Sequence, residues 1–109
     1  MTYEYSRKDS FRRDFELVGQ IRDSSGSVMD NIAEGFERGS NKEFIQFLYI
    51  SKSSNAEVRS QLYRAFDNQY IDEEEFTAAQ NLSKIIKKLL INLIKSLKRN
   101  RDGGMKYYD

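Results

Sequence analysis

Three residues that could together perform acid-base chemistry or bind an anion lie within eight positions of one another, namely Asn31, Glu34 and Arg38. A carboxylate such as that of Glu34 can act as a general acid or base. Glu34 and Arg38 are, however, four residues apart in the order that favours a salt bridge along one helix, so we interpret them as a structural pair. Gly35 and Gly39 end a helix at this point, whereas an anion site requires the start of one.

The rest of the sequence offers little catalytic chemistry. It has no histidine and no cysteine, and it contains neither a glycine-rich phosphate loop nor a zinc-binding spacing. The acidic run Glu73, Glu74 and Glu75 could suggest a metal site, but adjacent carboxylates point in three directions around a helix. Asp72 and Glu75 have the spacing of a capping box, which is the interpretation we prefer. We therefore expect a protein that is not an enzyme, with no cofactor and no metal site.

A second group of candidate residues is basic and follows Phe76, in a stretch with no acidic residue before Arg101. Such a stripe could bind the phosphate backbone of a nucleic acid. It could equally be a solvated face that places cations near the negative end of a helix dipole. The candidate nucleic-acid-binding residues are Lys84, Lys87, Lys88, Lys95, Lys98 and Arg99.

Length and composition limit the class of protein. A chain of 109 residues is expected to form a single domain, and the absence of cysteine favours a cytoplasmic location. No apolar run is long enough to span a membrane. The formal net charge is +1, from 18 Lys and Arg against 17 Asp and Glu, so a nucleic-acid surface would depend on an uneven distribution of charge.

Three amphipathic helices are predicted to position these residues, at about residues 11–38, 42–68 and 73–100. The apolar spacing of three, four and seven residues and the absence of proline indicate an all-α, antiparallel up-and-down helical bundle. Residues 1–10 are expected to be an irregular lead-in, and residues 101–109 a tail. Gly39 is expected to leave the first helix in a left-handed conformation, and Ser40 with Glu43 has the pattern of a capping box.

Polar and small residues interrupt the apolar stripes of the first two helices. The small residues of segment 24–27 are expected to let another helix approach closely rather than to break the first helix. Ser51, Ser54 and Asn55 occupy core positions and are expected to face polar partners, for which Asn31 and Glu34 are candidates.

Two further patterns predict contacts between helices. The apolar residues of segment 76–97 cover about half of a helix circumference, so this helix is expected to contact more than one partner. A line at seven-residue spacing, on another side of the second helix, is expected to be an oligomer interface rather than a base-stacking platform. Its members are Tyr49, Ala56, Tyr63 and Tyr70.

Three sequence motifs resemble a known family. They are Asn31-Ile32-Ala33-Glu34-Gly35 with Arg38, then Ser40-x-Lys42-Glu43-Phe44-Ile45-x-Phe47-Leu48, and later Tyr70-Ile71-x-Glu73-Glu74-Glu75-Phe76. The chain resembles, from about Phe15 to Lys98, the four-helix-bundle proteins encoded in intervening sequences of bacterial 23S ribosomal RNA genes, the S23 ribosomal protein family. This family is related to the accessory variability determinant of diversity-generating retroelements. The motif residues with an expected structural role are Asn31, Glu34, Gly35, Arg38, Ser40 and Glu43.

The resemblance implies a homo-oligomer, specifically a homopentamer, that binds RNA or DNA and a reverse transcriptase. One departure is that family members usually have a further amphipathic helix before the segment that matches residues 11–20, and residues 1–10 are too short to supply it. Either the start of the chain is trimmed or the chain is a three-helix version. A missing helix is expected to leave apolar surface uncovered and to favour self-association or the binding of a partner helix. The expected function is a non-catalytic accessory module that binds nucleic acid. The alternatives are a protein-protein interaction scaffold and, less favoured, a helical accessory subunit of a nucleotide-handling enzyme.

Overall fold

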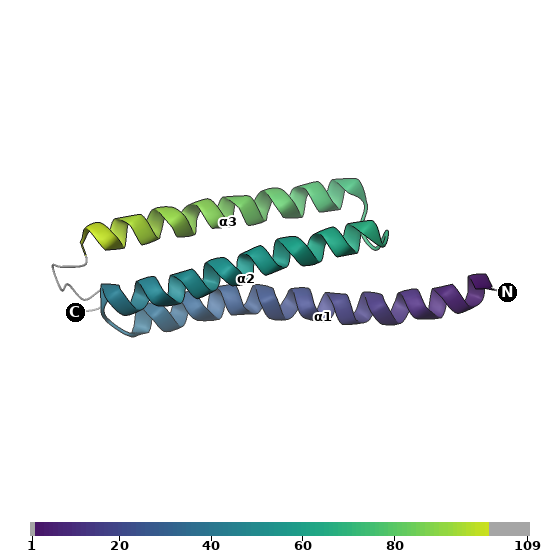
Figure 1. Cartoon of the computed structure of the whole chain (residues 1–109), viewed down its shortest axis with the longest axis horizontal. Helices are drawn as coiled ribbons and strands as arrows, with labels where there is room; N and C mark the ends of the chain where they lie inside the picture. The colour runs from purple at the N-terminus through teal and green to yellow at the C-terminus, as the bar shows by residue number, and fades with distance from the viewer. Residues whose placement is uncertain (1, 101–109) are drawn as a thin grey trace.

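The described part of the chain is all-helical and has three helices (Figure 1). A computed structural model describes residues 2–100, with side chains from residue 15 onward, and the predicted tail 101–109 lies outside the described residues. The helices are α1 (Thr2–Glu37), α2 (Asn41–Asp67) and α3 (Glu73–Arg99). Successive helices run in opposite directions, which confirms the predicted up-and-down helical class. Among the described residues, no helix is both long and apolar enough to cross a membrane.

Helix α1 begins earlier than the sequence pattern predicts. The expected lead-in is helical from Thr2, so α1 has 36 residues and does not start near Phe11. Asp9 and Ser10 resemble a helix cap, but nothing before them forces the chain out of a helix, because proline is absent and the first glycine is Gly19. Extending an existing helix adds one hydrogen bond for each residue that is ordered, so the helix continues toward the N-terminus.

The turn between α1 and α2 follows the predicted residues with one difference. Gly39 has a φ of 80°, and the Ser40 hydroxyl accepts a hydrogen bond of 3.2 Å from the Glu43 backbone N–H. The Glu43 carboxylate, however, accepts from the Ser40 hydroxyl (3.2 Å), so the Ser40 side chain makes both contacts. The predicted N-cap is confirmed, whereas the reciprocal bond to the Ser40 backbone that defines a full capping box is absent from the hydrogen bonds of this turn.

Small polar residues join α1 to α2, as the serine-rich segment predicts. Ser51 donates to the Val28 carbonyl oxygen (2.9 Å), and the hydroxyls of Ser27 and Ser54 lie 2.8 Å apart. The prediction that Asn31 and Glu34 are the direct partners of the α2 core residues is wrong. Asn31 instead donates to Ser27 on its own helix, since the short serine side chains bring the two helix backbones within direct reach.

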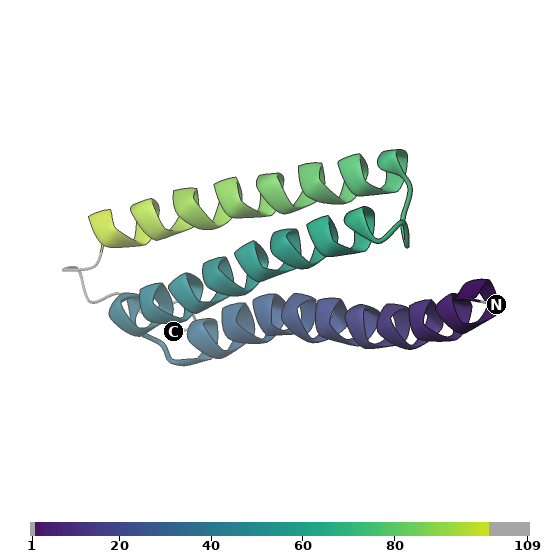
Figure 2. The same ribbon diagram turned by 45° about the vertical axis from the view of Figure 1, so that its right-hand side comes forward.

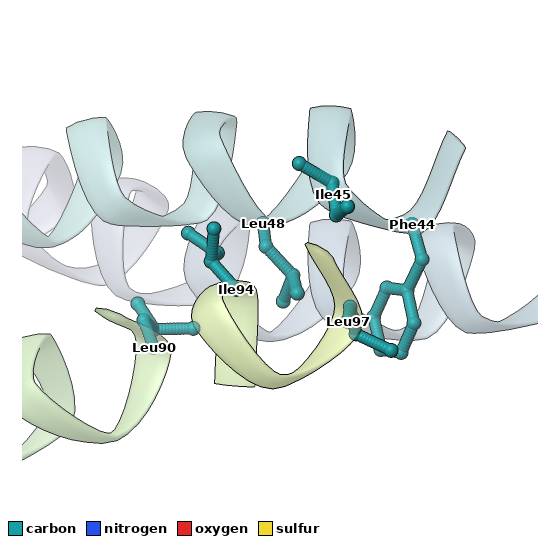
Figure 3. Close-up of a cluster of buried hydrophobic side chains, with 6 residues drawn as sticks. All are labelled: Phe44, Ile45, Leu48, Leu90, Ile94 and Leu97. Atoms are coloured by element: carbon teal, nitrogen blue, oxygen red, sulfur yellow. The ribbon is translucent and has the colours of Figure 1, made fainter. Parts of the chain in front are cut away.

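Helix α2 lies between α1 and α3, an arrangement that two views show (Figures 1 and 2). The α2–α3 side holds the main apolar cluster (Figure 3), which consists of Phe44, Ile45, Leu48, Leu90, Ile94 and Leu97. Beyond this cluster, Asn55 donates to the Ser83 carbonyl oxygen (2.8 Å) and its side-chain oxygen accepts from the Ser83 hydroxyl (3.0 Å). The polar core residues of α2 therefore contact both neighbouring helices.

Helix α2 covers only part of the apolar surface of α3. Leu90 and Ile94 face α2 and are buried, whereas Leu82 and Leu89 on the next side of the helix are 59% and 62% exposed. Packing between helices is extensive for α1 with α2 and for α2 with α3, but slight for α1 with α3. The second contact that the apolar pattern of α3 predicts is therefore not made within the described chain.

Candidate nucleic-acid interface

A capping box sets where α3 begins and hence which residues each side of it presents. The Asp72 carboxylate accepts from the Glu75 backbone N–H (2.7 Å), and the Glu75 carboxylate accepts from the Asp72 backbone N–H (2.9 Å). The predicted capping box is therefore confirmed. Within the described residues no group of three or more His, Cys, Asp or Glu side chains could hold a metal ion. The acidic residues of this first turn suit the positive end of the helix dipole.

The predicted basic residues of α3 share one arc of the helix. An apolar groove between α1 and α3 is lined by residues of all three helices, among them Leu82 and Ile86 on α3. Because successive residues turn by about 100°, Lys84, Lys88 and Lys95 lie together on the arc of α3 that faces away from this groove. Five of the six predicted residues are exposed, and Lys87 is half-buried. In residues 15–100 the ion pairs within 4.0 Å involve Arg38, and none involves these lysines. The positive charge of this arc is therefore available to a ligand.

Two further basic residues, which the sequence pattern did not single out, extend this surface across to α2. Lys52 and Arg59 lie with Lys87 around a hollow of about 300 Å³ whose lining contains no carboxylate. The complete lining is Tyr49, Lys52, Ser53, Ala56, Arg59 and Lys87. Lys52 and Arg59 follow Tyr49 and Ala56 by three residues, so helical spacing alone could have placed them beside the tyrosine line. We call this surface, made by Lys52, Arg59 and the six basic residues of α3, the basic seam.

An aromatic residue is held directly against the seam. The Lys98 ammonium donates a hydrogen bond to the Tyr49 hydroxyl (2.8 Å) and lies 5.3 Å from the centre of its ring. The hydrogen bond from Lys98 lowers the pKa of the Tyr49 phenol below its ordinary value, and the charge of Lys52 acts in the same direction. The lowered pKa reflects the positive charges around Tyr49, because these charges favour the ionised form of the phenol.

We expect Lys98→Met to raise the pKa of Tyr49 toward its ordinary value. The phenolate then loses both a hydrogen-bond donor and a positive charge, so ionisation moves to higher pH. A nuclear magnetic resonance titration of the Tyr49 ring through the alkaline range measures this shift. Lys95→Met is the matched control, since it removes the same charge from the same helix without contacting Tyr49. Equal ionisation midpoints in both variants would contradict the contact.

The predicted oligomer-interface residues lie beside the basic seam rather than on a separate face. Tyr49 and Ala56 line the hollow, and Tyr63 packs edge-on against Phe76 with ring centres 4.9 Å apart. Helix α2 ends at Asp67, so Tyr70 lies in the following turn and does not continue the helical line. The break occurs at Gln69, which has a φ of 62°. Tyr49, Ala56 and Tyr63 are all exposed to solvent. That these residues form an oligomer interface stays a prediction.

The polar residues near the α1–α2 turn contact one another across the two helices, which indicates a structural role. The Arg38 guanidinium donates to Glu34 (3.0 Å), lies 3.7 Å from the Glu43 carboxylate and covers the Phe47 ring at 5.1 Å. All of these charges are well exposed to solvent, where an ion pair contributes less than about 1 kcal/mol. Gly35 is buried, and a β-carbon added to it would lie 2.7 Å from the Phe47 β-carbon on α2. The cluster thus links the ends of two helices.

Taken together, these features define a small all-α bundle protein with a basic seam between its second and third helices. The chain belongs to the 23S rRNA-intervening sequence protein family, whose family model matches residues 1–92. The family resemblance of the α1–α2 motifs is thereby confirmed. No curated protein and no solved structure matches the chain.

Proposed function

We propose that this protein is a non-catalytic, oligomeric module that binds the phosphate backbone of RNA or DNA through the basic seam and serves a partner enzyme. The observation that carries the proposal is the group of cations from two helices around one hollow, with no carboxylate in its lining. Lysine and arginine side chains that neutralise phosphates supply most of the affinity of proteins that bind nucleic acid without sequence preference. The family name supports a connection with ribosomal RNA genes, and the resemblance favours a reverse transcriptase as the partner enzyme.

Oligomerisation would supply the positive charge that a single chain lacks. A net charge of +1 gives a weak overall attraction for a polyanion, so affinity must come from the local density of cations on the seam. Copies held in one assembly present several seams to the same nucleic acid, and linked weak contacts then act together.

The test is the binding of a fluorescently labelled RNA hairpin, followed by polarisation as the salt concentration rises. We expect affinity to fall linearly on a double-logarithmic plot. In Lys84→Gln/Lys95→Gln we expect the slope to fall by about 2, because each phosphate-contacting lysine contributes about 1. At low salt the affinity should fall roughly tenfold or more.

A matched control separates the seam from net charge. Gln20→Glu/Gln46→Glu changes the net charge by the same −2 at exposed positions on α1 and α2 outside the seam. We expect this variant to retain the parent slope. Absence of binding at low salt, or equal losses in the two variants, would show that the seam is only a solvated surface.

The second candidate function is a protein-protein interaction scaffold with no nucleic-acid role. It is favoured by the apolar side of α3, where Leu82, Ile85 and Leu89 are each more than half exposed. Large apolar side chains gathered on one surface usually lie at a protein interface. A protein that forms a stable assembly yet fails the salt-dependent binding test would support this alternative.

A further inference from the structure

The hollow between α2 and α3 differs from the rest of the basic seam in how far its cations are buried. Lys52, Arg59 and Lys87 line it and are all half-buried, whereas every other lysine and arginine of residues 15–100 is exposed. Lys52 and Arg59 are seven residues apart on α2, about 10.5 Å along the helix axis, and Lys87 borders the same space from α3. The three partly buried cations of the described chain therefore surround one small space.

These three charges have no counter-charge around the hollow. The ion pairs of residues 15–100 involve Arg38, and the lining of the hollow contains no carboxylate. Taking a cation partly out of water costs free energy, and like charges that share one space disfavour each other. An anion in the hollow would offset both effects. Three cations around one space favour an anion with more than one negative charge.

The size and the donors of the hollow limit the ligand to a small one. Its volume of about 300 Å³ is at the lower end of the range for small-molecule sites. Ser53 adds a hydroxyl to the lining, which can donate a further hydrogen bond. Ammonium and guanidinium groups bind phosphate oxygens through short, charge-assisted hydrogen bonds, and an arginine can bind two such oxygens at once. The lining thus has the chemistry of a site for one phosphate group.

We propose that this hollow binds a terminal phosphate, the phosphate monoester at the end of a nucleic-acid strand. A phosphate monoester carries a charge of about −1.5 to −2 at pH 7 and has three free oxygens. Each phosphodiester of the backbone carries a single negative charge and has only two free oxygens. Three partly buried cations therefore match a strand end better than an internal phosphate. An internal phosphate is also flanked by two nucleosides, whereas a terminal one presents a free side to the hollow.

This inference rests on the proposed function, because it divides the basic seam into two parts. The exposed arc of α3, with Lys84, Lys88 and Lys95, contacts the backbone at any point of a strand. The hollow contacts only the end of the strand. A strand bound in this way has its end at a fixed position on the protein, so the protein distinguishes cut strands from continuous ones.

The first test compares labelled RNA strands of one sequence that end in a 5′-phosphate, a 3′-phosphate or hydroxyls only, by fluorescence polarisation. We expect the parent to bind at least one phosphorylated strand about tenfold more tightly, because hydrogen bonds to charged groups contribute about that much. In Lys52→Gln/Arg59→Gln the affinity ratio should fall to about one. Lys84→Gln/Lys95→Gln is the matched control. It removes the same charge from the exposed arc, so it should weaken all strands equally and keep the ratio.

Two results of this test would overturn the proposal. Equal affinity of the parent for all three strands would mean that the hollow does not select a terminal phosphate. In that case salt-dependent binding of the strands would still support the proposed function, so the two failures are distinguishable. A preference that persists in Lys52→Gln/Arg59→Gln would mean that the terminal phosphate binds elsewhere. Circular dichroism confirms that each variant is folded.

The second test uses adenosine monophosphate, with adenosine as the control, and follows backbone amides by nuclear magnetic resonance. We expect the monophosphate to shift the amides of Lys52, Ser53, Arg59 and Lys87, and adenosine to leave them unchanged. A strand with a terminal phosphate should displace the monophosphate, and the hydroxyl-ended strand should do so less well. Failure of every strand to displace it would identify the free nucleotide as the ligand and overturn the proposal. Absence of any shift with the monophosphate would overturn it as well.

Discussion

Gly35→Ala is expected to destabilise the protein by about 2 kcal/mol, although alanine is ordinarily the better helix residue. A β-carbon at Gly35 would lie 2.7 Å from the Phe47 β-carbon and 2.9 Å from Cδ1 of Phe44. The Phe47 β-carbon is fixed to the backbone of α2, so no side-chain rotation relieves the contact and the helices must separate. Overpacking costs about 1–3 kcal/mol, and we expect the upper end, less about 1 kcal/mol gained in helix propensity.

Gly26→Ala is the matched control for this prediction. It lies in the same helix, and an added β-carbon would meet nothing within 4 Å. It should therefore stabilise the protein by about 0.5–1 kcal/mol through propensity alone. Urea unfolding followed by circular dichroism, at one protein concentration for all variants, measures both changes. If the two alanine variants shifted the unfolding midpoint in the same direction, Gly35 would not be a point of close helix contact.

Local patterns in the sequence predicted the helices and their caps. Apolar spacing identified all three helices, and Gly39, Ser40 and Asp72 carried their own conformational preferences, which act over a few residues wherever the chain is folded. The start of α1 was missed for the same reason. Asp9 and Ser10 resemble a cap locally, but a cap only takes effect where the helix ends, and no residue of the preceding segment ends it.

Contacts between helices were harder to predict, because they depend on how each helix is rotated about its axis. The predicted polar partners of Ser51, Ser54 and Asn55 are confirmed, but they are not the candidates that the sequence suggested. They are the Val28 carbonyl, Ser27 and Ser83, and not Asn31 or Glu34. A backbone carbonyl has no sequence pattern that identifies it as a partner. Sequence spacing likewise predicted the basic arc of α3. That Lys52 and Arg59 of α2 belong to the same basic seam could be seen only from how α2 and α3 pack together.

The two exposed sides of α3 explain how one helix could serve two purposes. Its apolar residues cover about half of the circumference, one part of which is used by α2. The rest, with Leu82, borders the groove, while Lys84 and Lys95 lie on the other side. A helix that separates its apolar and basic arcs in this way can join an assembly and still expose its charges to a polyanion. Assembly and binding are then expected to reinforce each other.

The second large effect is expected at Asn55, which is 2% exposed and joins α2 to α3. Asn55→Ala removes the bond to the Ser83 carbonyl and the bond from the Ser83 hydroxyl. The hydroxyl of Ser83, itself 3% exposed, then keeps only its longer bond to the backbone carbonyl of residue 55 (3.4 Å). We expect a loss of about 1–3 kcal/mol in the free energy of unfolding, since two buried hydrogen bonds between the helices are lost. Asn92→Ala, at an exposed asparagine of α3, should change stability by less than about 0.5 kcal/mol.

A double-mutant cycle shows whether the Asn55–Ser83 contact itself carries this energy. If the two side chains act as a pair, Asn55→Ala and Ser83→Ala together should cost less than the sum of the single variants, by about 0.5–3 kcal/mol. Urea unfolding of the four proteins measures this coupling. Simple additivity would mean that the loss comes from the space left by the asparagine. A coupled pair would mean that a polar contact in the core sets how α3 is rotated on α2, and therefore which of its arcs faces the groove and which faces the seam.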